Sequence, residues 1–301
     1  MTTRPGPDLQ VVTPALLRER PLPSVSGTTD KGTRGRVLVV GGGDETPGAV
    51  LLAGVAALRA GAGKLQLATS AAVATGLALA VPEARVVALP AGRAGSLGAE
   101  AAEAAGDLVR RADAVLVGTG ALDPDASGAL LRGIVPALGP ETALVVDAGA
   151  LPVLADDPGL LAPVRGRTVL IPNEVEAGVV LGDDAGAGPE AVLGALVARV
   201  GCTVALRHPD TLLAGPGTST YLDRSGHPGL GTSGSGDVLA GVLTGLLARG
   251  AEPLDAALWA VHLHGRAGEQ VAARVGGLGL LARELVDELP RVMSAVAGVA
   301  A

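Results

Sequence analysis

The chain has 301 residues, 23 of them basic and 30 acidic, which gives a formal net charge of −7 and a mass of 29.3 kDa. No stretch is strongly basic, and the aromatic residues amount to one Trp and one Tyr, so we expect no nucleic-acid partner and no stacking platform for bases. A single cysteine, Cys202, excludes a disulfide framework and a cysteine-clustered metal site.

The first thirty residues predict an irregular arm, because they carry scattered charge and five prolines. They contain no apolar stretch of the kind that a signal peptide needs. The longest apolar runs, such as 49–58, fall well short of the ~18 residues that suggest a membrane span. We therefore expect a cytoplasmic protein with no membrane partner, in which residues 31–301 form one domain after an arm of residues 1–30.

Between residues 37 and 207, short apolar runs that end in Gly, Asp or Pro alternate with Ala- and Leu-rich segments. Strands are predicted over 37–40, 64–69, 85–89, 114–117, 143–146, 168–171 and 202–207. Helices are predicted over 48–60, 98–111, 125–137 and 188–200. This alternation indicates βαβ units, and strands that are apolar throughout suit a mainly parallel sheet with helices on both faces.

The last third of the chain follows a different pattern. Residues 211–214 and 218–222 flank a Gly-Pro-Gly sequence and predict a hairpin. Helices are then predicted over 237–249, 254–274 and 281–298. We find no internal repeat and no linker that would separate two domains, and we expect residues 182–188 to form a surface loop.

Chemistry-bearing residues gather just after the predicted strands, where open α/β sheets bind their ligands. These residues are Gly41–Gly43, Gly118–Gly120, Asp147, Asn173 and Arg207. The first glycine turn matches neither the dinucleotide fingerprint nor the phosphate-binding P-loop. Asp147 could cap a loop or contact Mg²⁺ or water, and Asn173 could be a helix N-cap or a site residue.

The most informative motif is Gly231-Thr-Ser-Gly-Ser-Gly-Asp237, which runs directly into an apolar helix. A flexible turn at a helix N-terminus delivers backbone N–H groups to one point and makes an anion site. Asp237 there could simply stabilise the first helical turn. A carboxylate beside a bound phosphate would otherwise repel it, so we favour Asp237 as a base that takes the proton of a hydroxyl during phosphoryl transfer.

The order of several motifs resembles the NAD(P)H-hydrate dehydratase family of the ribokinase-like superfamily. The motifs are Gly234-Ser-Gly-Asp-Val-Leu-Ala-Gly241, His262-Leu-His-Gly-Arg-Ala-Gly-Glu269, Lys31-Gly32 with the strand after it, Ala56–Gly63, Asp147-Ala148 and Pro172-Asn173. Together they cover roughly residues 30–295. The resemblance implies a ribokinase-like three-layer αβα sandwich with a mainly parallel central sheet, and a single catalytic domain over residues 31–301.

The resemblance also implies a lyase that repairs hydrated NADH and NADPH. The hydroxyl on the nicotinamide ring would be phosphorylated and the phosphate then eliminated, with ADP (or ATP) as the phosphate donor and Mg²⁺ as cofactor. Members of the family also suggest a homo-oligomer, with a tetramer as the expected form.

The family's functional positions carry over residue by residue. Asp237 would be the catalytic base. The hydrated cofactor would contact Ala49, Gly120, Asn173 and Asp237, and the nucleotide would contact Arg207, His208, Pro209, Asp210, Thr211, Gly234, Ser235 and Gly236. No protein metal ligand is assigned.

This chain departs from the family pattern at several of these positions. Arg207-His-Pro-Asp-Thr211 stands where Lys-Gly usually precedes Thr, and Gly118-Thr-Gly-Ala-Leu122 stands for Gly-Pro-Gly-Leu-Gly. Asn173 replaces a common His, and Gly149 replaces an Asp. Two alternatives therefore stay open: a small-molecule kinase of the same superfamily acting on a vitamin-like alcohol, and a non-catalytic nucleotide-binding paralogue.

Overall fold

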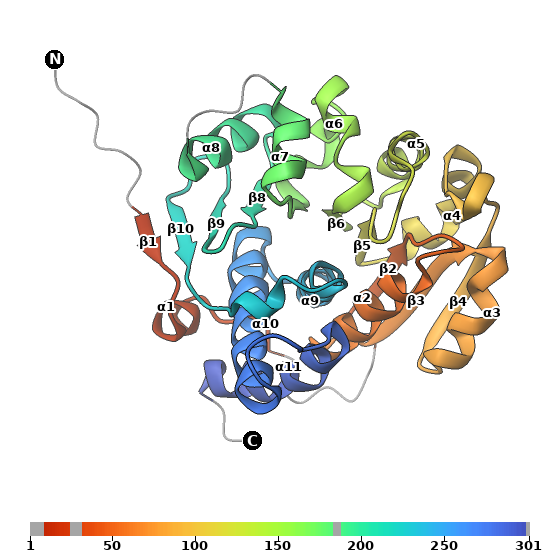
Figure 1. Cartoon of the computed structure of the whole chain (residues 1–301). Coiled ribbons are helices and arrows are strands. Elements are labelled where there is room, and N and C mark those ends of the chain that lie inside the picture. The colour runs from red at the N-terminus through yellow and green to blue at the C-terminus, as the bar shows by residue number, and fades with distance from the viewer. Residues whose placement is uncertain (1–8, 25–31, 183–187, 299–301) are drawn as a thin grey trace, which may run out of the picture.

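The structure is a computed structural model that describes residues 9–24, 32–182 and 188–298. These residues form one sheet with helices on both of its faces (Figure 1). Its strands are β1 (Leu9–Val11), β2 (Arg36–Val40), β3 (Lys64–Ser70), β4 (Ala84–Leu89), β5 (Ala114–Val117), β6 (Ala143–Val146), β7 (Thr168–Leu170), β8 (Thr203–Leu206), β9 (Thr211–Ala214) and β10 (Thr220–Asp223).

The strand order in the sheet is β1-β10-β9-β8-β7-β6-β5-β2-β3-β4. The seven strands from β8 to β4 pair in parallel, and β9 is antiparallel to both of its neighbours. Chain order reverses between β5 and β2, so their carboxyl ends flank a crevice of the kind in which open α/β sheets bind ligands.

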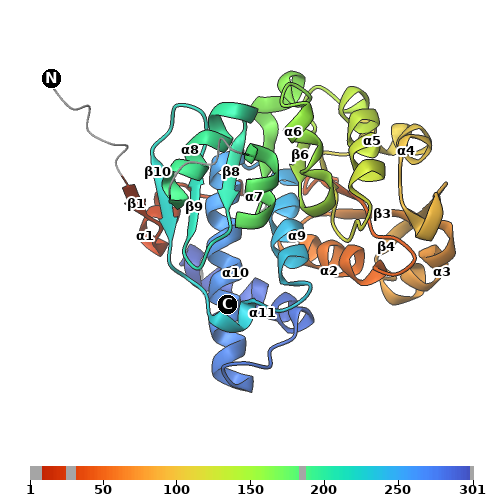
Figure 2. The same ribbon diagram turned by 45° about the horizontal axis from the view of Figure 1, so that its top comes forward.

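Two apolar layers cover the two faces, as successive residues of β2 show. Val37 and Val39 belong to one buried cluster and Leu38 and Val40 to the other. Figure 2 shows the helices on either side of the sheet. They are α1 (Pro14–Glu19), α2 (Pro47–Arg59), α3 (Ala71–Ala80), α4 (Ala99–Arg111), α5 (Pro124–Ile134), α6 (Val153–Asp156), α7 (Glu174–Leu181), α8 (Pro189–Val200), α9 (Ser235–Ala248), α10 (Pro253–Val275) and α11 (Ala282–Ala297). The predicted three-layer αβα sandwich is confirmed.

The expectation of an irregular N-terminal arm is wrong for the part that the structure describes. β1 pairs in parallel with β10, and α1 begins at Thr13, whose side chain accepts a hydrogen bond from the amide of Leu16. Leu17 is fully buried, and the indole of Trp259 donates to the carbonyl of Arg20. A three-residue strand is too short to show a period, and its partner lies far along the chain, so local pattern could not reveal it.

Two helices of the structure were not expected, and some expectations fall on residues that the structure does not describe. Helices α3 and α7 were not predicted, and they fill stretches between strands that the sequence left unassigned. Residues 183–187 of the expected surface loop, and Lys31 of the Lys31-Gly32 motif, lie outside the described residues. Residues 1–8 and 25–30 of the expected arm also lie outside them.

Close packing of α2 on α9 positions the start of α9 at the crevice. A Cβ atom at Gly241 would collide with the carbonyl of Ala53, and one at Gly245 would come within 2.9 Å of the Cα of Ala57. Glycine is needed at both positions because the two helix backbones touch.

No helix in the described part of the chain combines the length and the apolar character that a membrane crossing requires.

Candidate active site

The loop before α9 ends in a helix start that no side chain caps. Gly234 takes the N-cap position with a φ of 87°, a left-handed conformation that suits glycine. The first amides of a helix have no intrahelical acceptor; here the amide of Ser235 donates to the carbonyl of Thr232, and no side chain in the described part of the chain accepts the amides of Gly236 and Asp237. The N-terminus of α9 therefore presents free N–H donors that can hold an anion.

Asp237 lies in the first turn of α9 and is half-buried. Its Oδ1 accepts a hydrogen bond from the hydroxyl of Thr119, in the turn after β5. Burial raises the pKa of Asp237, while the Thr119 hydrogen bond and the charge of Arg207 act against that rise. A carboxylate whose pKa is moved towards neutrality is a stronger general base than an exposed one.

Arg207, at the end of β8, occupies the centre of the site. Its Nε donates to the carbonyl of Ile171 at 2.9 Å, and its Nη2 contacts Oε2 of Glu176 at 3.1 Å. A Cβ atom at Gly236 would collide with Nη1 of Arg207. The glycine thus allows the guanidinium to reach the first turn of α9, where it adds positive charge to the helix amides.

Asp147 follows β6 and is almost completely buried, with 2% of its surface exposed. Its Oδ1 lies 3.6 Å from Nη2 of Arg207 and has no hydrogen-bond partner among the described residues. Burial raises the pKa of Asp147 to about 7; the charge of Arg207 opposes this, and the carboxylates of Glu176 and Asp237 reinforce it. Asp147 is therefore a buried acid facing the same arginine as the two other carboxylates.

Asn173 forms the N-cap of α7. Its side chain accepts a hydrogen bond from the amide of Glu176, and the Glu176 carboxylate accepts one from the amide of Asn173. An isolated parallel bridge also joins Asn173 to Arg207. Of the two roles left open by the sequence, Asn173 performs the capping role, and it does so beside the central arginine.

The structure brings Ala49 and Gly120 together at the switch point. Gly120 has a φ of 67°, and a Cβ atom on it would lie 2.6 Å from the Cβ of Ala49. The Thr46 hydroxyl donates to the carbonyl of Gly120 at 2.5 Å, and the amide of Gly42 donates to the carbonyl of Thr119 at 2.8 Å. The two glycine turns that follow β2 and β5 are therefore bonded to each other.

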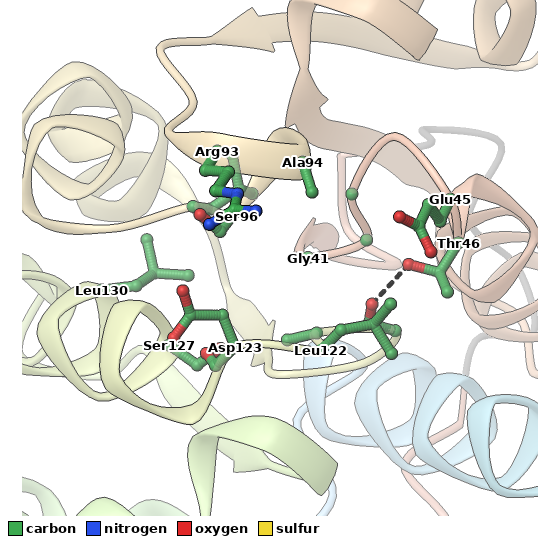
Figure 3. A pocket seen from close by; sticks show the side chains of 15 residues that line it. Gly41, Glu45, Thr46, Arg93, Ala94, Ser96, Leu122, Asp123, Ser127 and Leu130 are labelled. Carbon is green, nitrogen blue, oxygen red and sulfur yellow. Dashed lines mark hydrogen bonds between the residues drawn. The ribbon is translucent and has the colours of Figure 1, made fainter.

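A cavity of about 250 Å³ opens beside these turns (Figure 3). Its lining is mostly apolar or backbone, with polar side chains around it. Arg93 and Ser96 lie on one side, and Glu45 and Thr46 lie across from them. The full lining is Gly41, Gly42, Gly43, Glu45, Thr46, Arg93, Ala94, Ser96, Leu97, Gly120, Ala121, Leu122, Asp123, Ser127 and Leu130. Gly120 lines the cavity and the preceding residue, Thr119, contacts Asp237, although neither Thr119 nor Asp237 belongs to the lining.

The predicted stretch 207–211 does not enter the site as a unit. Of its residues, Arg207 contacts α9, at Gly236, whereas His208 and Asp210 pair with side chains of other elements. His208 pairs with Glu174 at 3.1 Å, and Asp210 lies 3.7 Å from Arg224. Pro209 is exposed, and Thr211 begins β9, where it pairs with Asp223.

Sequence reasoning missed several residues that meet here. Thr119 contacts Asp237, and Glu176 holds Arg207. His264 hydrogen-bonds through Nε2 with the hydroxyl of Ser235 at 2.9 Å, and burial lowers its pKa to about 4. The Asn-x-x-Glu spacing of a capping box could have revealed Glu176, but no local signal marks the other two.

A three-layer α/β sandwich with an uncapped Gly-Asp helix start at its topological switch point defines a ribokinase-like, nucleotide-dependent enzyme. The family model described as NAD(P)H-hydrate dehydratase matches residues 37–291. The chain belongs to the NAD(P)H-hydrate dehydratase family, whose members are lyases, as the resemblance predicted.

Individual relatives agree with this assignment. An ADP-dependent (S)-NAD(P)H-hydrate dehydratase from Xanthomonas campestris pv. campestris is 45% identical over 96% of this chain and 97% of its own. A bifunctional NAD(P)H-hydrate repair enzyme from Moorella thermoacetica is 36% identical over 90% of this chain, which spans about half (52%) of that protein.

Solved structures agree on the fold. The ADP/ATP-dependent NAD(P)H-hydrate dehydratase from Bacillus subtilis, co-crystallised with ATP and Mg²⁺, has a TM-score of 0.79 at 27% identity, covering 96% of this chain and 99% of that one. A ribokinase-like superfamily protein from Enterococcus faecalis has a TM-score of 0.82 at 22% identity, with 99% of each chain covered.

Proposed function

We propose that this chain is an ADP-dependent dehydratase that restores hydrated NADH and NADPH to the reduced cofactors. The observation that carries the proposal is the placement of Asp237, which is half-buried in the first turn of α9 and hydrogen-bonded to Thr119, the neighbour of the cavity-lining Gly120. The relative from Xanthomonas supports the choice of ADP as the nucleotide.

The nucleotide's phosphates would bind at the start of α9. The amides of the first turn and the guanidinium of Arg207 meet at Gly236 and together neutralise negative charge. The chain as a whole is acidic, so local donors rather than net charge must attract the nucleotide. We assign Gly234, Ser235, Gly236 and Arg207 to this role; His208–Thr211 would reach only more distant parts of the nucleotide.

The hydrated dinucleotide would bring its ring hydroxyl to Asp237 from the cavity side. Asp237 takes the hydroxyl proton while the oxygen attacks the terminal phosphorus of ADP, so an O–P bond forms and AMP leaves. The ring's C–O bond then breaks, phosphate departs, and loss of a proton from the neighbouring carbon restores the double bond.

The remaining substrate contacts are proposed from the lining of the cavity. Gly120 lines the cavity and packs against Ala49, which lies just behind the lining, and Asn173 would act through its place beside Arg207. Arg93 has an exposed guanidinium on the cavity wall that can meet a phosphate group, and the Glu45 carboxylate can accept hydrogen bonds from ribose hydroxyls. A site of about 250 Å³ accommodates only part of a dinucleotide, with the rest extending into solvent.

We expect Mg²⁺ to arrive with the nucleotide. Within the described residues, no group of three or more His, Cys, Asp or Glu side chains could hold a metal ion, and Asp147 and Glu176 both face Arg207. The side chains in 9–24, 32–182 and 188–298 thus offer no cluster of protein ligands for Mg²⁺. Mg²⁺ is commonly held by substrate phosphates with few protein ligands, and no step above depends on its position.

The kinase alternative shares the helix start and the fold. A hydroxyethylthiazole kinase from Pyrococcus horikoshii has a TM-score of 0.58 at 22% identity, which shows a common fold only. A stable phosphorylated product accumulating from a vitamin-like alcohol would favour the kinase, and tight ADP binding without turnover would favour the non-catalytic paralogue.

The direct test is to incubate the protein with hydrated NADH, Mg²⁺ and either ADP or ATP, and to follow the return of the dihydronicotinamide absorbance. We expect recovery with ADP. Asp237→Asn should reduce kcat by on the order of 10²–10⁴, the usual contribution of a general base, while ADP affinity stays close to that of the wild type. No recovery with either nucleotide would refute the proposal, and a fully active Asp237→Asn variant would remove Asp237 from the mechanism.

A further inference from the structure

Thr119 connects the two halves of the site. It is fully buried in the turn after β5, between Gly118, whose φ is 106°, and Gly120. Its carbonyl accepts the amide of Gly42, and its hydroxyl donates to Oδ1 of Asp237. One residue therefore contacts the opposite glycine turn through its backbone and the candidate base through its side chain.

We propose that Thr119 is a positioning residue for the dehydratase reaction, holding the Asp237 carboxylate by one oxygen so that the other faces the hydroxyl of the substrate. This inference rests on the proposed function, because it assumes that Asp237 is the base. In this arrangement Thr119 acts through Asp237 and need not touch the substrate.

The surroundings hold the Thr119 side chain in a single orientation. A Cβ atom at Gly41 would collide with the carbonyl of Thr119 and would lie 3.1 Å from its Cγ2 methyl. The missing side chain at Gly41 is thus what allows the Thr119 methyl to pack there while the hydroxyl points to Asp237. A buried hydroxyl that donates to a carboxylate has little freedom to turn elsewhere.

The carboxylate of Asp237 is correspondingly asymmetric. Oδ1 is taken by Thr119, whereas no described residue hydrogen-bonds to Oδ2, which lies 4.0 Å from the position that a Cβ atom at Gly234 would occupy. A general base needs one oxygen within hydrogen-bond reach of the proton that it removes. Fixing Oδ1 leaves Oδ2 available for that contact.

The hydroxyl also favours the ionised form of Asp237, because a donated hydrogen bond stabilises a carboxylate. The charged groups around it come from three other elements. Arg207 after β8 lowers the pKa of Asp237, and the buried acid Asp147 after β6 is coupled to Asp237 by like charge. His264 of α10 has a pKa lowered to about 4, so it adds no positive charge near neutral pH. Loss of the hydroxyl should therefore raise the pKa of Asp237.

The contact depends on the residue type at this position. A residue without a side-chain hydroxyl, such as proline or valine, could not donate this hydrogen bond. The hydrogen bond to the base is thus a consequence of this chain's own Gly-Thr-Gly turn.

The experiment compares Thr119→Val, which keeps the shape and removes the hydroxyl, with Thr119→Ser, which keeps the hydroxyl. With hydrated NADH and ADP, we expect Thr119→Val to lower kcat roughly ten- to a hundred-fold, the effect of one hydrogen bond to a charged group. The acidic limb of its kcat/KM profile should move to higher pH, while the KM for ADP stays near the wild-type value. Thr119→Ser should restore both the rate and the pH profile.

A Thr119→Val enzyme with wild-type kcat and an unmoved acidic limb would overturn the proposal. Equal losses in the Val and Ser variants would also overturn it, because they would trace the effect to packing of the methyl group. Thermal unfolding of both variants separates misfolding from loss of positioning. If the wild type fails to dehydrate its substrate, the proposed function fails, and the Asp237 pKa measured by carbon NMR in the wild type and in Thr119→Val tests the contact by itself.

Discussion

Arg207 shows how single residues set the electrostatics of this site. Its guanidinium pairs with Glu176 at 3.1 Å, lies 3.6 Å from Asp147 and touches the helix start at Gly236. One positive charge thus pairs with two carboxylates, and within the part of the chain that the structure describes Oδ1 of the deeper one, Asp147, accepts no hydrogen bond. The negative charge of the buried Asp147 carboxylate is only partly balanced by Arg207, so the protonation of Asp147 should change with pH.

The stability of the protein should depend on pH through Asp147. Its folded-state pKa of about 7 lies above its ordinary value of 3.8, so the folded state binds this proton more tightly than the unfolded chain does. The stabilisation is complete below 3.8 and is lost as pH rises towards about 7. We therefore expect the free energy of unfolding of Asp147→Asn, compared with that of the wild type, to be higher at pH 8 than at pH 5 when both are measured by denaturant unfolding.

Asp107→Asn provides the matched control, because the Asp107 side chain lies 76% exposed on α4. This control shows the effect of removing an acidic group from the surface. An Asp147→Asn variant whose stability difference from the wild type changes with pH no more than that of Asp107→Asn would show that the buried acid does not titrate in that range.

The spacing of α2 and α9 is the main constraint at the scale of elements. Helix α2 carries Ala49, which packs against Gly120, α9 carries Asp237, and Gly241 lets the two backbones meet at Ala53. Any group added there must push apart the two helices that bound the site. Stability and catalysis are therefore linked at this contact.

Replacing Gly241 with alanine should lower the free energy of unfolding by about 1–3 kcal/mol, the usual cost of overpacking a filled interior. It should also lower kcat, because Asp237 moves with its helix. Gly194→Ala in α8 is the control, since a Cβ atom there meets nothing within 4 Å and the substitution should stabilise by about 0.5–1 kcal/mol. Equal stabilities of the two variants in a denaturant titration would contradict this account of the α2–α9 contact.

The loop after β4 should contribute to substrate binding through Arg93. If Arg93 meets a phosphate group, Arg93→Ala will raise the KM for hydrated cofactor about ten-fold or more, as for the loss of a charge-assisted hydrogen bond. A larger effect on hydrated NADPH than on hydrated NADH would place the extra phosphate of NADPH there, and equal effects would indicate the shared pyrophosphate. Arg85→Ala on β4 removes the same charge outside the cavity lining, and an Arg93→Ala variant that behaves like it would exclude this contact.

At the scale of the whole molecule, exposed apolar side chains suggest association between copies of the chain. Val175 and Val179 lie one turn apart on α7 and are 77% and 49% exposed. A contiguous exposed apolar patch marks an interaction surface, and two valines one turn apart on a helix would contribute to such a patch. We therefore propose that the chain forms a homo-oligomer, as the family resemblance implies.

Sedimentation equilibrium should give a mass above the 29.3 kDa of one chain. A double variant, Val175→Glu with Val179→Glu, should shift the equilibrium towards the monomer if α7 lies in the interface. A wild-type protein that sediments as a single chain at micromolar concentration would contradict the proposal.

Local pattern was sufficient for most of the sheet and its helices. The strands at 37–40 and 114–117 and the helices near 48–60 and 254–274 were predictable because each has a continuous apolar run or period bounded by turn residues. β1 was missed because three residues show no period, and α7 because its Asn173–Glu176 capping box was not used as a helix start.

The sequence by itself determined the alternation of strands and helices, the glycine turns and the Gly-Asp start of α9, because these depend on residues close together in the chain. Only the tertiary structure decided which of them meet. Thr119 and Asp237, which contact each other, are 118 positions apart in the sequence. The order of strands in the sheet brings Arg207 next to Asp147, Glu176 and Gly236. Side-chain contacts between distant segments follow from how the layers pack, and no local period encodes that packing.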